Sequence, residues 1–315
     1  MAAKRGARPS QRKPARPSSR GTSGGGARSG GPRSGGSRGG SRGGVRNAPR
    51  DSAPTASRNV SRDKGLGGEQ VEGRQAVREL LIARSRKIRE VWISNDIDQS
   101  EIIDDIVELA HASNVQVLDV PRRKLEDQAR SEAPQGVLAF AAPLREADFD
   151  QLISPRDGNV PFLVAVDGVT DPGNLGALLR CCDGAGVNGV ILPKHRAVHV
   201  TPTVAKTSAG AVEYVPMAVV SGLPNAITQM RSKGVWVVGL DDASDKTLFD
   251  LGNLASEPIC MVLGAEGAGL SRLVRERCDM VVSIPMAGQV SSLNVSAAAA
   301  LAVYEVARVR AHLGS

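Results

Sequence analysis

Near its C-terminus the chain reads Ile284-Pro285-Met286-Ala287-Gly288-Gln289-Val290-Ser291-Ser292-Leu293-Asn294-Val295-Ser296. The β-branched run at 281–284, which a proline ends, predicts a short strand. Residues 297–310 begin with four alanines and continue with apolar residues at helical spacing, which predicts a buried helix. Loops between such elements often bear functional groups, although the serines and the asparagine of this loop would also serve as ordinary helix caps.

Two further loops of the same kind follow apolar runs. Residues 167–180 read Asp-Gly-Val-Thr-Asp-Pro-Gly-Asn-Leu-Gly-Ala-Leu-Leu-Arg, and residues 263–270 read Leu-Gly-Ala-Glu-Gly-Ala-Gly-Leu. Continuous apolar runs between helices predict parallel strands that are covered on both faces. Because ligands of such sheets gather beyond the carboxyl ends of the strands, the three loops are expected to share one site.

The C-terminal half of the chain is therefore predicted to be an α/β domain with a parallel sheet, spanning residues 161–315. Strands are predicted at 162–166, 189–192, 217–220, 235–240, 259–263 and 281–284. Helices are predicted at 175–185, 204–212, 223–233, 270–277 and 297–310.

The three loops resemble the three sequence motifs of the SPOUT superfamily, and within it of the TrmH-type RNA ribose 2′-O-methyltransferases. Residues 167–180 resemble the first motif, 263–270 the second and 284–298 the third, in the same order and with similar spacing over roughly 160 residues. The resemblance implies a C-terminal domain that binds S-adenosyl-L-methionine (AdoMet) in a trefoil knot. Knots are rare among protein folds, so only the resemblance predicts one here.

In the resembled family the methyl donor is held mainly by backbone groups of the second and third motifs. An adenine edge can pair with backbone amides and carbonyls where glycines permit close approach, so the assignment is chemically reasonable. A phosphate-binding glycine loop is the alternative for 263–270, but the segment has neither the Rossmann glycine order nor a Walker lysine. The resemblance gives as donor-binding residues Leu263, Gly264, Ile284, Met286 and Leu293.

For the reacting side of the site, the resemblance implies that Arg180 is the general base. A guanidinium keeps its proton far above neutral pH, so we favour a role in orienting the ribose and stabilising the developing 2′-oxyanion. Gly176, one turn earlier, is expected to leave room beside Arg180 for a phosphate or ribose. Taken alone, these residues would also fit helix caps and solvated surface groups. Further polar groups expected to assist are Asn174, Glu266, Ser292 and Asn294.

The N-terminal residues 1–65 are rich in arginine, glycine and serine. They contain 16 Lys or Arg and two Asp, a net charge of +14; the whole chain has +7, which leaves −7 for residues 66–315. Such a segment has too few apolar residues to form a core and is predicted to be a disordered tail. Its charge suits electrostatic contact with RNA, with a merely solubilising role as the alternative.

Residues 68–143 are predicted to be a small α/β domain, with helices at 74–83 and 101–112 and strands at 88–93, 115–120 and 137–142. Gly73-Arg74 and residues 134–137 resemble the L30e-like RNA-binding domain found in several ribosomal-RNA members of the family. A linker is predicted at 144–160. Arg74 and Lys206 are the predicted RNA contacts, and further candidates for phosphate contacts are Arg84, Arg86, Lys87, Arg122, Arg123 and Lys124.

No apolar run is long enough to span a bilayer, and no signal sequence follows Met1, so a cytoplasmic protein is expected. The four cysteines lie in apolar or helical segments without C-x-x-C spacing, which favours reduced core thiols over disulfides or a metal site. The expected function is AdoMet-dependent, metal-independent 2′-O-methylation of 23S ribosomal RNA by a homodimer. The alternatives are a tRNA methyltransferase and a non-catalytic ribosome-associated RNA-binding protein.

Overall fold

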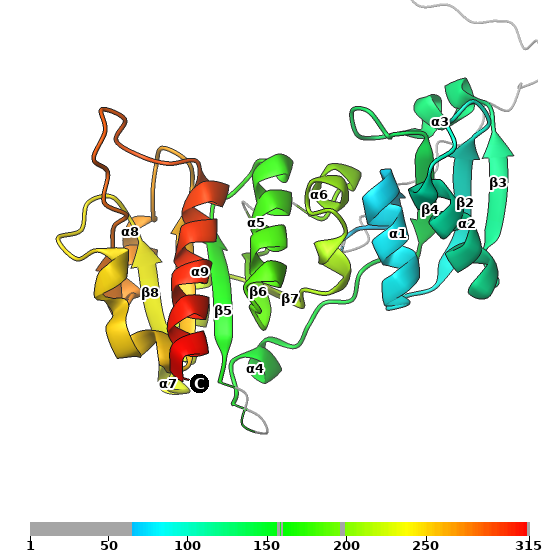
Figure 1. The fold of residues 1–315 in the computed structure, drawn as a ribbon. Helices are drawn as coiled ribbons and strands as arrows, with labels where there is room; N and C mark the ends of the chain where they lie inside the picture. Colours follow the sequence, from blue (N-terminus) through cyan, green and yellow to red (C-terminus); the bar gives the residue numbers. More distant parts are fainter. Residues whose placement is uncertain (1–64, 156–157, 159, 196–198, 314–315) are drawn as a thin grey trace, which may run out of the picture. The chain divides into compact units, whose positions relative to one another are not determined.

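The computed structural model describes residues 65–155, 158, 160–195 and 199–313 (Figure 1). The tail predicted at 1–65 lies outside the described residues, apart from its last residue. The described residues form two β-sheets with helices packed against them. No helix in this part of the chain is long and apolar enough to cross a membrane.

The smaller sheet has four strands in the order β1-β4-β2-β3. β2 and β3 are parallel, whereas β4 is antiparallel to both β1 and β2. One face is covered by two amphipathic helices, whose buried residues pack against Val91, Ile93 and Ala139. The elements are β1 (Gln70–Glu72), α1 (Arg74–Ala83), β2 (Ile88–Ser94), α2 (Glu101–Ala112), β3 (Gln116–Val120), α3 (Arg122–Gln128) and β4 (Val137–Ala141).

The larger sheet has six parallel strands in the order β10-β8-β9-β5-β6-β7. The parallel α/β sheet predicted from the apolar runs is therefore confirmed. The two most central strands, β9 and β5, each end at one of the loops singled out in the sequence. The strands are β5 (Phe162–Asp167), β6 (Gly189–Pro193), β7 (Met217–Val220), β8 (Trp236–Leu240), β9 (Ile259–Gly264) and β10 (Met280–Val282).

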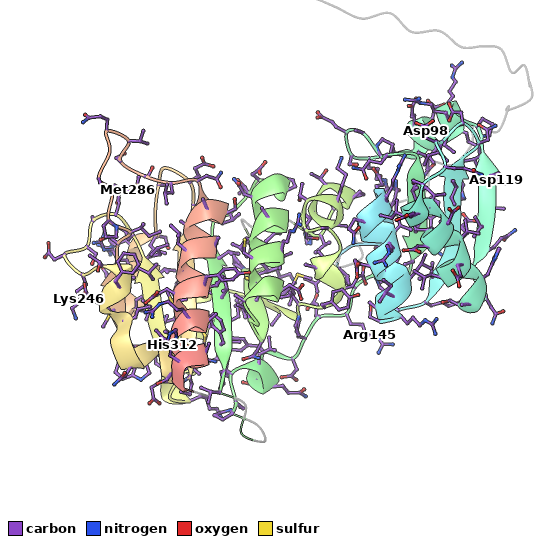
Figure 2. All side chains as sticks on the ribbon, viewed as in Figure 1. Asp98, Asp119, Arg145, Lys246, Met286 and His312 are labelled. Carbon is purple, nitrogen blue, oxygen red and sulfur yellow. The ribbon has the colours of Figure 1, made fainter. Side chains whose placement is uncertain are left out.

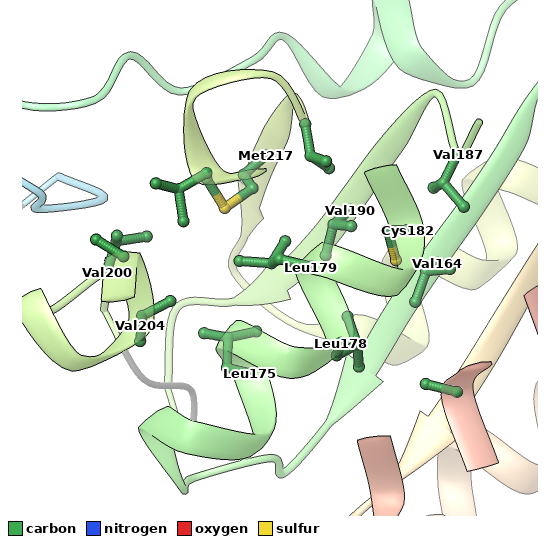
Figure 3. Packing of buried hydrophobic residues seen from close by; sticks show 14 of the residues in the cluster. Val164, Leu175, Leu178, Leu179, Cys182, Val187, Val190, Val200, Val204 and Met217 are labelled. Atoms are coloured by element: carbon green, nitrogen blue, oxygen red, sulfur yellow. The ribbon is translucent and has the colours of Figure 1, made fainter. Parts of the chain in front are cut away.

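Alternate residues of the central strands point into two separate cores, as expected for a sheet that is covered on both faces. Val164 and Val190 lie beside Leu178 and Cys182 of α5 (Figure 3), whereas Leu163 and its alternates pack against α7 and α8. The helices that pack around the first core are α5 (Pro172–Gly184), α6 (Pro202–Thr207), η1 (Ala211–Glu213), η2 (Leu248–Ser256) and α9 (Val295–Leu313). The helices that pack around the second core are α4 (Phe149–Leu152), α7 (Leu223–Ser232) and α8 (Arg272–Arg277).

The helix predicted at 204–212 was wrong. Thr201 caps α6 and Pro202 occupies its first turn, but the helix ends at Thr207. Ala209 and Gly210 then have φ angles of 51° and 90°, which stop the helix, and the short 3₁₀ helix η1 follows. The sequence reading also missed β1, α3, η2 and α4, the last of which lies inside the predicted linker. The trefoil knot stays a prediction from the resemblance.

A buried ion pair joins Arg86 and Glu213, for which the sequence predicted no contact. Nη2 of Arg86 lies 2.6 Å from Oε1 of Glu213 in η1, and the two side chains are 3% and 0% exposed. Nη1 of Arg86 also donates to the carbonyl oxygens of Gly68 and Ala142. Arg86 is thus fully engaged within the protein, which argues against its predicted phosphate contact.

Candidate active site

A cavity of about 440 Å³ lies beyond the carboxyl ends of β8, β9 and β10. Its wall is formed by the loop 264–270 after β9, by the loop after β10, which includes Met286 (Figure 2), and by the start of α9. A cavity of this size can hold a small organic molecule. All five residues predicted to bind the methyl donor line it, namely Leu263, Gly264, Ile284, Met286 and Leu293, together with the predicted Glu266 and Ser292.

The 264–270 loop folds back tightly on itself. Backbone N–H groups of Ala265 and Gly269 donate to each other's carbonyl oxygens, at 3.1 and 2.9 Å. A Cβ atom on Gly264 would lie 2.2 Å from the carbonyl carbon of Gly269, so no larger residue fits there without moving the backbone. The glycines therefore expose peptide groups, rather than side chains, to part of the cavity.

An ion pair that the sequence reading missed lies at the end of β8. Oδ1 of Asp241 is 2.9 Å from Nη1 of Arg275, and its Oδ2 accepts a hydrogen bond from the backbone N–H of Leu270. The Asp241 side chain is 7% exposed and that of Arg275 is 40% exposed, and both residues line the cavity. Asp241 directly follows an apolar strand, so the carboxyl-end rule that selected the other loops would have found it.

Side chains of the three motifs form a chain of hydrogen bonds. Nδ2 of Asn294 donates to Oδ1 of Asn174 at 2.9 Å, and Nδ2 of Asn174 donates to Oε2 of Glu266 at 3.2 Å. Oδ1 of Asn294 accepts hydrogen bonds from the backbone N–H and hydroxyl of Ser296. Three of the predicted catalytic residues are therefore brought together, and each motif supplies one of them.

Asn174 does not cap its own helix. The cap of α5 is Asp171, whose Oδ1 accepts a hydrogen bond from the backbone N–H of Asn174 at 2.7 Å. The amide of Asn174 is consequently free to join the loops after β9 and β10. Asn294, by contrast, does cap α9, because its side chain accepts the N–H of Ser296 and its carbonyl accepts that of Ala298.

Arg180 lies on the exposed side of α5 and does not line the cavity. Among the described residues its guanidinium makes no hydrogen bond or ion pair. The room predicted beside Gly176 was wrong, because a Cβ atom there would lie 1.9 Å from Oγ1 of Thr207 in α6. Any partner of Arg180 must therefore approach from the solvent side of α5 and not across Gly176.

The two predicted RNA contacts both bind the loop before β4. The backbone N–H of Arg74 donates to Oε1 of Gln135 at 3.0 Å, and its Nε donates to the carbonyl oxygen of the same residue at 3.3 Å. Nζ of Lys206 donates to the carbonyl oxygens of Glu132 and Ala133. Lys206 thus has protein partners, while Arg74 is only half-buried.

All four cysteines are free thiols, as predicted. Burial raises the pKa of the thiols of Cys182 and Cys260 well above the usual range, and it raises that of Cys278 to about 12. These thiols stay protonated at neutral pH, which excludes them as nucleophiles. Within the described residues, no group of three or more His, Cys, Asp and Glu side chains is arranged to hold a metal ion.

Two family models match the chain. Residues 161–304 match the SpoU rRNA Methylase family, and residues 70–147 match the family described as RNA 2'-O ribose methyltransferase substrate binding. Two solved structures have the same fold. The SpoU methyltransferase AviRb of Streptomyces viridochromogenes, in complex with AdoMet, is 28% identical with a TM-score of 0.64, covering 77% of this chain and 90% of that one. The AdoMet-bound rRNA methyltransferase of Sinorhizobium meliloti is 26% identical with a TM-score of 0.62, covering 76% and 86%.

The matches to sequence relatives cover nearly the entire length of those relatives. A protein of Staphylococcus haemolyticus assigned to the TrmH family of tRNA/rRNA methyltransferases is 42% identical over 246 residues, which cover 78% of this chain and 97% of the relative. YacO of Bacillus subtilis, assigned to the same family, is 39% identical over 249 residues, covering 78% and 98%. With such identity over such a span, the chain belongs to the TrmH family of RNA methyltransferases, with a SpoU-type methylase domain.

Proposed function

We propose that this protein transfers a methyl group from S-adenosyl-L-methionine to a ribose 2′-hydroxyl of 23S ribosomal RNA. The main observation in favour is that all five predicted donor-binding residues line one cavity, whose polar edge adjoins the Asn174–Glu266 pair. Under this proposal residues 68–143 form the RNA-binding domain, 144–160 the linker and 161–315 the methyltransferase domain. The enzyme would act in the cytoplasm, without a metal ion.

The cavity has a suitable set of groups for this donor. Leu263, Ile284 and Leu293 supply apolar contacts for an adenine ring. The peptide groups around Gly264 supply the donors and acceptors that an adenine edge needs, and the missing Cβ permits close approach. When bound, the donor would supply an electrophilic methyl group on a sulfonium.

The chain of hydrogen bonds through Asn174 would fix the geometry on the ribose side. Asn294 holds Asn174, and Asn174 holds Glu266 at the cavity wall. A fixed carboxylate and amide can orient a hydroxyl group for in-line attack, and orientation of this kind gives large rate effects. The hydroxyl proton would pass to the Glu266 carboxylate or to water, and the donor would leave as the neutral thioether. Arg180, which has no partner among the described residues, would stabilise the negative charge that develops on the 2′-oxygen.

A second copy of the chain is the proposed partner at α9. Leu301 and Tyr304 are 47% and 52% exposed, and their i, i+3 spacing places them side by side on one face of this helix. Arg180 also lies on the solvent side, on the neighbouring helix α5. A homodimer formed here would bury Leu301 and Tyr304 and enclose the guanidinium. Leu301→Glu should give monomers in analytical ultracentrifugation, and an unchanged dimer would exclude this surface.

Both tRNA and rRNA are candidate substrates, because the sequence relatives are assigned to tRNA/rRNA methylation together. Ribosomal RNA is favoured by the L30e-like resemblance of residues 68–143. The decisive experiment is to map 2′-O-methyl groups in total RNA from cells with and without the protein. A mark lost only from 23S RNA supports the proposal, a mark lost from tRNA supports the alternative, and unchanged RNA together with absent AdoMet binding supports a non-catalytic binding protein.

A further inference from the structure

One face of the smaller sheet is only partly covered. α1 and α2 pack on the opposite face, whereas among the described residues this face has only α3 against it, through Leu125, Leu138 and Val120 (Figure 1). Trp92 of β2 and Phe140 of β4 lie on the uncovered part and remain partly exposed. Their rings meet edge to face, with centroids 5.4 Å apart and an interplanar angle of 74°.

Cations lie directly over both aromatic rings. Nζ of Lys124 is 4.8 Å from the centre of the Trp92 ring, and the guanidinium carbon of Arg89 is 5.9 Å from that of Phe140. Neither cation has a carboxylate within ion-pair distance among the described residues, in contrast to Arg78, Arg86 and Arg122. Two aromatic faces, each beside an unpaired cation, match the chemistry of an unpaired nucleotide, which has a flat base and an adjacent phosphate.

Two shallow hollows flank Trp92 and share that residue and Gln128. They measure about 440 and about 530 Å³, and Arg123 and Arg130 line them in addition to the two cations above. Three acids, Glu69, Glu90 and Asp127, line them as well, so these groups sum to a net charge of only +1. We therefore expect few phosphate contacts, with base stacking as the larger contribution.

The indole N–H of Trp92 is the second indication of a ligand. Nε1 is buried and has no hydrogen-bond acceptor among the described residues. Buried donors without a partner are uncommon in folded proteins. An oxygen of a bound nucleotide that lies in the plane of the indole ring, such as a ribose hydroxyl beside the stacked base, could supply the missing acceptor.

We propose that Trp92 and Phe140 form a stacking site for unpaired bases of the substrate RNA, in which a base replaces Lys124 on the indole and Lys124 moves to the adjacent phosphate. Stacking of a base on an aromatic ring is stronger than an exposed cation–π contact, so the exchange is favourable. The proposal rests on RNA being the substrate. It adds an RNA contact at a surface separate from the predicted contact Arg74. The protein's own basic tail is a poor occupant, because its charge repels the four cations.

Fluorescence can test the site directly, because the chain has only two tryptophans, Trp92 and Trp236. In full-length Trp236→Phe protein, Trp92 is the only indole. A single-stranded ten-nucleotide RNA, added at about 0.2 M salt to weaken phosphate-only binding, should quench its emission with saturation. The same sequence in a duplex should quench it far less, since paired bases cannot stack on the ring. Equal quenching by the duplex, or by base-free polyphosphate, would overturn the stacking model in favour of a general polyanion site.

Three substitutions separate stacking from charge and from folding. Trp92→Leu keeps an apolar side chain but removes the aromatic face, and should weaken single-strand binding about 5- to 100-fold. Trp92→Phe should restore most of that loss. Lys124→Gln should retain quenching and lower the salt slope by about 0.7. Wild-type affinity in Trp92→Leu, or no recovery in Trp92→Phe, would refute the proposal.

Calorimetry of AdoMet binding serves as the folding and function control. The donor cavity shares no residue with the Trp92 surface, so each variant should bind AdoMet like the parent. Normal donor binding together with an unaffected RNA affinity would contradict the stacking site while leaving the proposed methyl transfer intact. Absent donor binding in the parent protein, with Trp92 still quenched by RNA, would contradict the proposed methyl transfer alone.

Discussion

Nδ2 of Asn294 donates a hydrogen bond to Oδ1 of Asn174 across 120 residues of sequence, at 2.9 Å. Asn294 starts helix α9, and Asn174 lies in the first turn of α5. The contact joins these two helix starts at the carboxyl edge of the larger sheet, and the other side of the Asn174 amide reaches Glu266. A change at one of the three residues should therefore disturb the positions of the other two.

Asn174→Ala and Asn294→Ala should each slow single-turnover methylation, by up to about 10²-fold, because loss of either side-chain amide breaks the same series of hydrogen bonds. The double variant should be little slower than the slower single variant, as expected for residues that act as a unit. Asn253→Ala, at an exposed asparagine of η2, is the matched control. Fully additive losses would show that the two asparagines act independently.

Arg180→Ala should leave AdoMet binding nearly unchanged, because the side chain does not line the cavity proposed to bind the donor. The methylation rate should fall by about 10²- to 10³-fold, the effect of removing one preorganised group that stabilises an oxyanion. Arg180→Lys keeps the charge without the planar fork, so recovery in this variant measures how far charge alone suffices. Wild-type turnover by folded Arg180→Ala protein would make Arg180 an ordinary surface residue.

Stability should fall as the pH rises from about 9 towards 12. Burial, with the nearby Asp279 carboxylate, raises the pKa of Cys278 from 9.0 to about 12, and burial with the hydrogen bond to Glu79 raises that of Tyr214 from 10.0 to about 12. In this range the unfolded chain loses these protons before the folded chain does, which favours unfolding. Below the unfolded pKa values the contribution is fully present.

Urea unfolding at intervals between pH 7 and 11 measures this effect. Cys278→Ala and Tyr214→Phe should each give a shallower decline of the unfolding free energy above about pH 9. The slope is the informative quantity, since either substitution also changes the stability at neutral pH. Identical slopes in the parent and both variants would contradict the raised pKa values.

Arg310 should be the strongest single contributor to stability among the surface arginines of α9. Its guanidinium donates to the carbonyl oxygens of Val160, Pro161, Ala255 and Glu257, all at 2.9 to 3.0 Å, and lies 5.0 Å from the ring centre of Phe162. Desolvation lowers its pKa, but the charge persists at neutral pH.

Arg310→Ala should lower the unfolding free energy by about 2 to 4 kcal/mol, because four carbonyl oxygens lose a charged donor. Lysine has the charge but cannot reach four acceptors at once, so Arg310→Lys should recover less than half. Arg272→Ala is the control: its ion pair with Glu276 in α8 is solvent-exposed, and its loss should cost no more than about 1 kcal/mol. Similar losses in both alanine variants would contradict the assignment.

The basic tail should add affinity for RNA without selecting the methylated nucleotide, because phosphate contacts position a protein but do not specify sequence. Removal of residues 1–65 should flatten the salt dependence of RNA binding by roughly 0.7 to 0.9 in log–log slope for each lost contact. The position of the methyl mark should be unchanged. A shifted mark, or an unchanged slope, would contradict this role.

The larger sheet and the place of the site could be predicted from sequence because the signals are local. A strand such as Phe162–Asp167 is apolar at almost every position, and only a sheet covered on both faces accommodates that pattern. Once parallel strands are assigned, their carboxyl ends must lie along one edge, which places Asn174, Glu266 and Asn294 near one another. The residues predicted to bind the donor came from the motif resemblance.

The wrong predictions concern residues whose conformation or contacts depend on residues that are distant in the sequence. Gly176 looked open in sequence because its contact with Thr207 depends on how α5 packs against α6. Lys206 looked available for phosphate, yet its ammonium binds the carbonyl of Glu132, 74 residues away. The end of α6 depends on a left-handed Ala209, a conformation for which alanine gives no signal. Short elements such as β1 have too few residues for a period to be recognised.

The tight turn at Gly264 also bears on inhibition. Part of the cavity wall is peptide backbone, and a side chain as small as alanine at Gly264 would collide with Gly269. Few substitutions would therefore give resistance to a compound that binds those peptide groups, since a substitution at Gly264 would damage the turn itself. Resistance should instead arise at cavity residues with freer side chains, such as Met286 and Leu293, which are 38% and 37% exposed. Compounds that ignore those two side chains should retain potency for longest.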